Sequence, residues 1–316
     1  MKRFLLVLLT LVLTLGMVSA HAEGKTFRVG IIQFVQHEAL DAATQGFADE
    51  LQARLGDRVE CIVQNASGDT ANCATIANGF VSSGVDLIMA NATPALQAAV
   101  GATADIPILG TSVTDFTTAL ELDALKDDGT TGLNVSGTSD LSPLDQQAAM
   151  IREWMPDAKT VGLLFCSAEA NSLFQVANMR KHLEALGFTC MDFAFTDSND
   201  IASLAQQATA CDVIYIPTDN TAAAYAETIG SVIEPAGIPC FTGEEGIASQ
   251  CGIATLTINY ADIGKETGAM AFEVLEQGAK VSEMPIRFAP VVTKKFNAAI
   301  CEVLGLTAPE GYVAIQ

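Results

Sequence analysis

The stretch Ile214-Tyr215-Ile216-Pro217-Thr218-Asp219-Asn220-Thr221 predicts a strand that leads directly into a helix. The apolar, β-branched run over 213–216 is typical of a buried strand, and Pro217 ends it. Polar side chains follow before a helix begins at about Ala222, and open α/β sheets bind ligands at such strand ends. Asp219 or Asn220 could equally cap the helix, so a binding site is indicated only if similar junctions recur.

Such junctions do recur, because apolar strand patterns alternate with amphipathic helix patterns along the chain in two similar blocks. Continuous apolar strands that alternate with helices predict parallel sheets covered on both faces. We therefore predict an α/β fold of two lobes with a ligand cleft between them. The predicted strands cover 27–34, 59–63, 86–90, 106–109, 160–165, 188–193, 213–216, 238–241 and 253–256.

The predicted lobes are discontinuous in sequence. The first lobe takes residues 25–136 plus 258–283, and the second takes 137–257 plus 284–316. The chain then crosses between the lobes near 136, 257 and 284. A long helix over 259–277 returns to the first lobe, 286–292 is extended, and a final helix is expected over 294–304.

Residues 1–22 have the pattern of a secretory signal peptide. Lys2-Arg3 precedes the apolar run from Phe4 to Met17, and cleavage fits after Ala22 or after Ala20. No cysteine follows either position, so we expect a periplasmic protein without a lipid anchor.

Composition excludes several partners and cofactors. The chain of 316 residues is half hydrophobic and carries a formal net charge of −21, which argues against nucleic acid and anionic membranes. No dinucleotide fingerprint, P-loop, nucleophile elbow or H-E-x-x-H is present, so we expect no cofactor, no metal and no enzymatic activity.

The cysteines leave two readings open. An even count of eight in an oxidising compartment permits disulfides, with Cys240–Cys251 the best pair and Cys61–Cys73 the second. The apolar neighbours of Cys166, Cys190 and Cys211 instead favour buried free thiols at those positions.

Polar side chains at the strand ends differ between the lobes. Those of the first lobe are mostly neutral donors, whereas those of the second lobe, among which we placed Ser139 and Asp140, are acid-rich. A zwitterion fits this asymmetry, with its carboxylate at the helix that begins near Thr93 and its ammonium on Asp219. For each residue, helix capping is the alternative. The expected ligand-binding residues are Gln36, His37, Thr93, Ser112, Asn171, Asp219, Asn220 and Glu244.

Six of these junctions, taken in order and spacing, resemble the substrate-binding proteins of ABC importers of the tryptophan/tyrosine-transport type. The motifs are Ile32-Gln33…His37-Glu38-Ala39-Leu40-Asp41, Asn91-Ala92-Thr93-Pro94-Ala95, Ser112-Val113-Thr114-Asp115, Gly137-Thr138-Ser139-Asp140, Ser167-Ala168-Glu169-Ala170-Asn171-Ser172 and Pro217-Thr218-Asp219-Asn220-Thr221.

This resemblance implies a type I periplasmic-binding-protein fold, with two Rossmann-like lobes joined by three hinge strands. It also implies that Thr93, Ser112, Asn171, Asp219 and Asn220 contact the ligand. We expect a monomer that captures an amino acid, such as tryptophan, tyrosine or phenylalanine, and delivers it to an inner-membrane ABC permease.

Aromatic residues that could stack on a ligand ring are few. Those near the junctions are Phe34, Phe116, Phe174 and Phe241, and core packing is the other role open to each. Two alternatives to the import function also stay open. One is the same fold binding a sugar or another neutral polar ligand, and the other is a secreted enzyme or a sensor domain.

Overall fold

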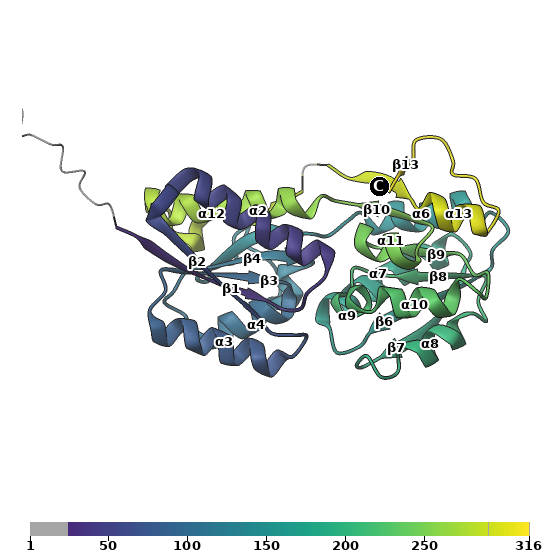
Figure 1. Ribbon diagram of the computed structural model, residues 1–316, viewed down its shortest axis with the longest axis horizontal. Helices are drawn as coiled ribbons and strands as arrows, with labels where there is room; N and C mark the ends of the chain where they lie inside the picture. Colours follow the sequence, from purple (N-terminus) through teal and green to yellow (C-terminus); the bar gives the residue numbers. More distant parts are fainter. Residues whose placement is uncertain (1–24, 290, 316) are drawn as a thin grey trace, which may run out of the picture.

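The computed structural model describes residues 25–289 and 291–315, which form two lobes side by side along the long axis of the molecule (Figure 1). The predicted signal peptide over 1–22 lies outside the described residues. Within the part of the chain that is described, no helix is long and apolar enough to cross a membrane.

The first lobe is built on a six-stranded sheet in which every pair of neighbouring strands is parallel. Its strand order is β11-β5-β4-β3-β1-β2. The strands are β1 (Phe27–Gln33), β2 (Val59–Asn65), β3 (Leu87–Asn91), β4 (Ile108–Val113), β5 (Val135–Ser139) and β11 (Arg287–Phe288).

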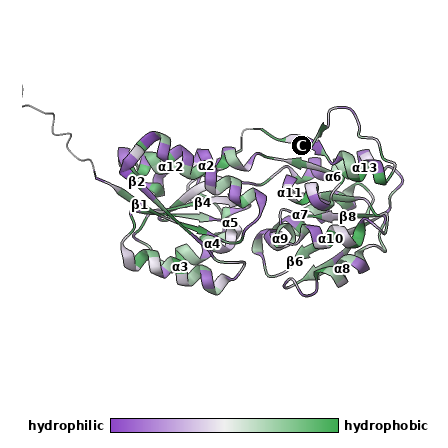
Figure 2. Cartoon of the chain, in the orientation of Figure 1, coloured by the Kyte–Doolittle hydropathy of each residue, from purple (hydrophilic) through white to green (hydrophobic). Residues whose placement is uncertain are grey.

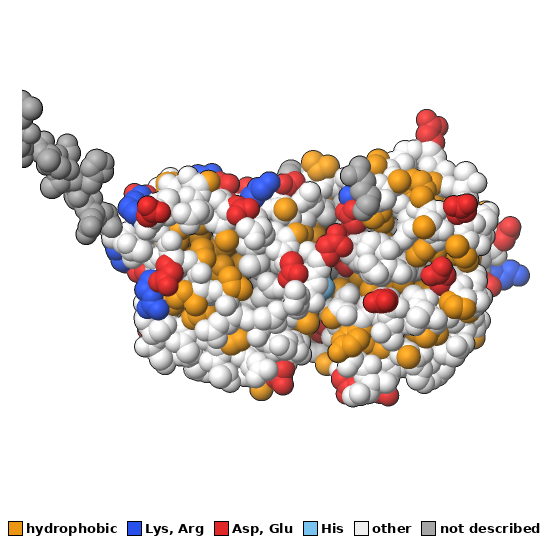
Figure 3. Space-filling view, viewed as in Figure 1, with side chains coloured by type: hydrophobic (Ala, Val, Ile, Leu, Met, Phe, Trp, Pro, Cys, Tyr) orange, Lys and Arg blue, Asp and Glu red, His pale blue; other side chains and the backbone are white. Residues whose placement is uncertain are grey.

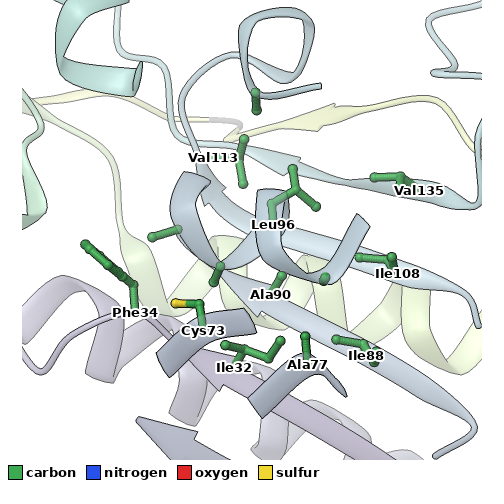
Figure 4. Packing of buried hydrophobic residues seen from close by; sticks show 14 of the residues in the cluster. Ile32, Phe34, Cys73, Ala77, Ile88, Ala90, Leu96, Ile108, Val113 and Val135 are labelled. Carbon is green, nitrogen blue, oxygen red and sulfur yellow. The ribbon is translucent and has the colours of Figure 1, made fainter. Parts of the chain in front are cut away.

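Alternate strand residues point to opposite sides of this sheet. Because the residues on both sides are apolar, helices cover both faces. Val29 and Ile31 pack with Phe47 of α2 and Met270 of α12 on one face. The other face, which includes Ile32, packs against α3 and α4 (Figure 4). The helices are α2 (Glu38–Leu55), α3 (Thr70–Ser83), α4 (Thr93–Ala102), α5 (Phe116–Ala119) and α12 (Tyr260–Gln277), with short 3-10 turns η1 (Gly56–Arg58) and η2 (Val281–Glu283).

The second lobe has a seven-stranded sheet of order β13-β12-β10-β9-β8-β6-β7. All neighbours are parallel except β10 and β12, which are antiparallel. The strands are β6 (Thr160–Cys166), β7 (Thr189–Phe195), β8 (Val213–Ile216), β9 (Cys240–Thr242), β10 (Ala254–Thr257), β12 (Thr293–Phe296) and β13 (Val313–Ala314).

This sheet is also enclosed by helices, and its central strands β8 and β6 are hydrophobic and buried over almost their whole length (Figure 2). One face packs against α6, α7 and α13, and the other against α8, α10 and α11. The helices are α6 (Leu144–Trp154), α7 (Ala170–Ala185), α8 (Ile201–Ala208), α9 (Asn220–Ala224), α10 (Ala226–Ile233), α11 (Glu245–Cys251) and α13 (Ala298–Val303). The predicted α/β architecture of two parallel-sheet lobes is therefore confirmed.

The first sheet extends further along the chain than the predicted lobe boundaries. It includes 137–139 at the end of β5 and 287–288 in β11, which we had placed in the second lobe. Gly137 explains the first difference, because any side chain there would overlap the backbone of Gly110 in β4. The crossings follow Ser139, Thr257 and Phe288.

The predicted final helix begins later than expected. Residues Thr293–Phe296 form β12, which pairs antiparallel with β10, and Asn297 then caps α13 by accepting from Ala299 N and Ile300 N. Edge pairing with a strand distant in sequence has no local signal, so the sequence pattern extended the helix into this strand.

The predicted disulfides are not formed. All eight cysteines lie in the described residues and are free thiols. Cys240 and Cys251, the favoured pair, are both buried, and their thiols donate to the carbonyl oxygens of Phe241 and Ile247. The alternative, buried free thiols, describes six of the eight cysteines, whereas Cys61 and Cys190 are only partly buried.

Candidate functional site

The carboxyl ends of both sheets face the gap between the lobes, which is visible as a notch at the lower edge of Figure 3. Hydrogen bonds cross this gap. His37 Nε2 lies 3.4 Å from Asn220 Oδ1, and Gln175 Nε2 donates to Thr114 Oγ1 at 3.4 Å. The lobes are therefore in contact at their strand ends.

Thr93 and Ser112 form the part of the first-lobe wall that has unused hydrogen-bonding capacity. Thr93 begins α4, directly after β3, and Ser112 lies near the end of the neighbouring strand β4. Both residues are buried, and neither hydroxyl has a hydrogen-bond partner among the described residues. Because buried hydroxyls normally have partners, these two are candidates for ligand contact.

The backbone at the same place is strained. Ala92 has φ 89° and ψ 157°, and Ser112 has φ 53°, both in regions that L-residues seldom occupy. Ala92 N donates to Thr111 O at 3.0 Å, which holds the two turns together. No side chain caps the N-terminus of α4, so its first N–H groups stay available for an anion.

Asp219 is held entirely within the second lobe. Its Oδ2 accepts from Cys166 N at 2.6 Å and from Ser172 Oγ at 2.7 Å, and its Oδ1 accepts from Ala222 N at 2.7 Å. Burial raises the pKa of Asp219 to about 7, and the nearby charge of Glu169 adds to the effect. The geometry thus makes Asp219 the cap of α9, which is the alternative role considered from the sequence.

Glu169 and Glu244, two other buried acids of the second lobe, likewise accept hydrogen bonds from their own lobe. Glu169 accepts from the amide side chains of Asn171 and Asn220 and from the backbone N–H and hydroxyl of Thr221. Glu244 accepts from Gly246 N and Ile247 N, both at 2.7 Å, and so caps α11. Burial raises the pKa of Glu244 to about 7.

Asn171, Asn220 and His37 meet at the gap. Asn171 Nδ2 donates to Glu169 Oε2 at 3.0 Å, but its Oδ1 is buried and has no partner among the described residues. His37 Nδ1 is also buried without a partner. Burial lowers the pKa of His37, so its ring is neutral near pH 7.

Three cavities border the gap. The largest, about 600 Å³, is lined from the first lobe by residues that include Phe34 and Pro94, and from the second lobe by residues that include Glu169 and Tyr225. A cavity of about 270 Å³ is lined by Gln36, His37 and Glu244, among others. A third, of about 360 Å³, lies toward the hinge and includes Glu38, Tyr260 and Lys295 in its walls.

Of the four aromatic residues considered for stacking on a ligand ring, Phe34 is the one that lines the largest cavity. Phe116 and Phe241 are core residues, and Phe174 is half-buried on α7. Phe34 packs in the first-lobe core and also lines the largest cavity.

Tyr225 and Asp140 lie outside the expected ligand-binding set, although the structure places Tyr225 at the largest cavity and Asp140 at the first crossing between the lobes. Tyr225 stands where the predicted helix breaks into α9 and α10, and its side chain is 42% exposed toward the largest cavity. Asp140 follows β5 and is 3% exposed, with Oδ1 lacking a partner among the described residues. In the sequence, the position of Tyr225 directly after Ala222-Ala223-Ala224 is the only local sign of its role. Asp140 is one of many polar residues at predicted strand ends, and no local pattern distinguishes it from the others.

Comparison with known proteins agrees with this geometry. The family model described as ABC transporter substrate binding protein matches residues 28–314. A tyrosine-binding protein of Clostridioides difficile (strain R20291) is 34% identical over 266 residues, which cover 83% of this chain and 76% of the relative.

Two similar solved structures differ in whether a ligand is bound. An ABC domain from Streptococcus pneumoniae in complex with L-Trp has a TM-score of 0.86 at 34% identity, covering 92% of this chain and 100% of that one. A ligand-free, open structure of a substrate-binding protein with adhesive properties from Clostridium difficile has a TM-score of 0.69 at 33% identity, covering 92% and 99%. At nearly equal identity, the present lobe arrangement is closer to that of the ligand complex.

The predicted resemblance is thus confirmed by a family match over nearly the whole described chain. The two-lobed α/β fold, with strand ends that face a central gap, is shared with these relatives at the TM-scores above. The chain belongs to the family of ABC transporter substrate-binding proteins.

Proposed function

We propose that this chain captures an aromatic amino acid between its lobes and delivers it to an ABC permease. The observation that carries the proposal is a row of subsites along one sheet edge. Ser112 lies near the end of β4, and Thr93 and Phe34 follow β3 and β1; these three strands are neighbours in the order β4, β3, β1. Adjacent strands lie about 4.8 Å apart, so the three positions fit one small elongated ligand.

The ligand's carboxylate binds at the N-terminus of α4. The hydroxyls of Thr93 and Ser112 are buried without partners, and the uncapped helix end provides N–H donors and a favourable dipole. A carboxylate satisfies all of these groups at once, and it supplies the compensation that a buried hydroxyl requires.

The aromatic ring occupies the cavity of about 600 Å³, a volume typical of small-molecule sites. Phe34 provides an aromatic surface from the first lobe and Tyr225 one from the second, and Pro94, which follows Thr93 directly, also lines this cavity. Aromatic pairs add favourable energy beyond simple burial, which supports a ring here rather than a sugar.

The names of the relatives support the same ligand class. One is a tyrosine-binding protein and another was solved with L-Trp. The proposal extends this chemistry to the present chain because the polar and aromatic subsites above have the character that a zwitterion with a ring requires.

Ligand binding works by holding the lobes together. Few direct hydrogen bonds cross the gap, of which His37–Asn220 and Gln175–Thr114 are both long at 3.4 Å. A ligand that contacts both lobes stabilises the closed state through contacts that the open state lacks. The permease then receives the closed, loaded form.

The location and assembly of the protein complete the proposal. Members of this family act outside the cytoplasm, and the N-terminal pattern over 1–22 supports export to the periplasm with cleavage of that segment. We propose a monomer that binds and releases its ligand unchanged, without catalysis.

The experiment is a thermal-shift screen of the mature protein after ligand removal, followed by calorimetric titration. Amino acids, sugars and nucleosides are each added in excess, since a ligand that binds only the folded state raises its stability. We expect shifts with tryptophan, tyrosine or phenylalanine alone. A shift confined to sugars would overturn the aromatic assignment, and no shift with any class would overturn the receptor function.

A further inference from the structure

A zwitterion enclosed between the lobes needs a partner for its ammonium group. An unpaired charge is costly to bury, so a closed site requires a carboxylate with free acceptor positions. Asp219 was the sequence-based choice, but its oxygens already accept three hydrogen bonds from its own lobe. Glu169 and Glu244 are likewise used by neighbouring donors.

Asp140 differs from these three acids. One oxygen, Oδ2, accepts from Tyr260 OH at 3.0 Å, whereas Oδ1 is buried and has no hydrogen-bond partner in the described part of the chain. Burial, the larger effect, raises the pKa of this carboxyl to about 6, although the hydroxyl of Thr114 also lies near it and lowers that pKa. Asp140 therefore retains acceptor capacity inside the closed structure.

The position of Asp140 continues the row of subsites. It follows β5, which is the neighbour of β4 on the side away from β3. Its backbone N donates to Val113 O at 3.2 Å, which places it beside Val113, the last residue of β4 and the residue after Ser112. Along the sheet edge the order is thus Asp140, Ser112, Thr93 and Phe34, matching ammonium, carboxylate and ring.

We propose that Asp140 is the binding residue for the ligand's α-ammonium group, with Tyr260 holding its second oxygen. This inference rests on the proposed function, because it assigns a role within the amino-acid site. It also explains why a carboxylate lies buried at the first crossing between the lobes, where Tyr260 at the start of α12 comes from the second crossing.

The test compares two ligands that differ only in the ammonium group. L-Tryptophan and 3-indolepropionic acid share the ring and the carboxylate, and each is titrated calorimetrically into the full mature protein and its Asp140→Asn variant. Asparagine keeps the shape and can still accept from Tyr260. We expect the wild type to prefer tryptophan about 10- to 100-fold, and the variant to lose most of that preference.

The control variant is Asp145→Asn, which removes an exposed acid from α6 and leaves the row of subsites intact. It should keep the preference of the wild type. If the wild type binds no aromatic amino acid, the proposed function fails. If the wild type binds tryptophan and Asp140→Asn keeps the same preference, only the assignment of Asp140 is overturned.

A crystal structure of the wild-type protein with L-tryptophan gives a readout that does not depend on the variant folding. We expect the ammonium nitrogen within about 3.2 Å of an Asp140 carboxylate oxygen. An ammonium placed on Asp219, Glu169 or Glu244 instead would overturn the inference.

Discussion

Asp219 shows how one polar residue at a strand end can serve structure rather than ligand. Its carboxylate joins Cys166 of β6, Ser172 of α7 and Ala222 of α9. These bonds organise the second-lobe side of the gap. An acid used in this way has a structural role whether or not it also contacts the ligand.

Replacing Asp219 should therefore cost stability. We expect Asp219→Ala to lower the free energy of unfolding by about 1–3 kcal/mol, because two backbone N–H groups lose their buried acceptor. Urea denaturation measures this. The matched control is Asp200→Ala, since Asp200 precedes α8 without a side-chain cap bond, and its change should stay within about 0.5 kcal/mol. Unchanged stability with a selective loss of tryptophan affinity would instead place Asp219 in contact with the ligand.

Tyr225 is the second residue whose role can be tested alone. We expect Tyr225→Ala to weaken binding of tryptophan about 5- to 50-fold, because the ring subsite loses its second-lobe aromatic wall. Tyr225→Phe keeps the ring and should bind nearly as the wild type does. Calorimetric titration distinguishes the two variants, and equal affinity of Tyr225→Ala and wild type would remove the ring from this cavity.

At the scale of elements, α2, which follows Gln36 and His37, packs closely against α12. Gly46 of α2 lies against the carbonyl of Ala261, and Gly264 of α12 lies against the carbonyl of Ala43. A side chain at either glycine would overlap backbone, so the two helices approach more closely than ordinary residues allow.

This packing predicts opposite effects for two glycine substitutions. Gly264→Ala should destabilise the protein by about 1–3 kcal/mol, since the helices must separate. Gly79→Ala in α3 meets nothing within 4 Å and should stabilise by about 0.5–1 kcal/mol through better helix propensity. Chemical denaturation of both variants checks the pair, and a stabilising Gly264→Ala would contradict the close contact.

For the whole molecule, buried carboxyl groups determine how stability depends on pH. Burial raises the pKa of Asp140 to about 6 and those of Asp219 and Glu244 to about 7, from ordinary values of 3.8 and 4.5. At a pH between the ordinary and the raised pKa of such a group, the folded state holds a proton that the unfolded state has released. The contribution of these three groups to the free energy of unfolding is therefore fully present below about pH 4, and it is lost as the pH rises toward 7.

We accordingly expect the melting temperature of the ligand-free protein to fall by several degrees between pH 5 and pH 7.5. Repulsion within a chain of net charge −21 acts in the same direction. Differential scanning calorimetry in buffers of equal ionic strength measures the trend. Glu244→Gln should flatten the curve, and a melting temperature that rises over this range would contradict the buried acids.

Much of the fold could be predicted from local patterns. The buried strand over 213–216 and the helix over 259–277 agree with β8 and α12 within a residue. The helix expected over 294–304 was wrong at its start, because Thr293–Phe296 pairs with β10. At the site, Thr93 and Ser112 lie at the gap with unpartnered hydroxyls as their strand-end positions indicated, whereas Asp140 and Tyr225 were not selected.

The sequence by itself determined the alternation of strands and helices, the two-lobed α/β class and the strand ends where a site could form. These properties depend on apolar periodicity and on cap residues, which act over a few neighbouring positions. Only the tertiary structure decided which acids are occupied and which are free. Two of the three donors to Asp219 lie 47 and 53 residues away in the chain, and the hydroxyl that holds Asp140 comes from Tyr260, 120 residues away. Hydrogen-bond satisfaction is a property of groups brought together by folding, and no local pattern contains it.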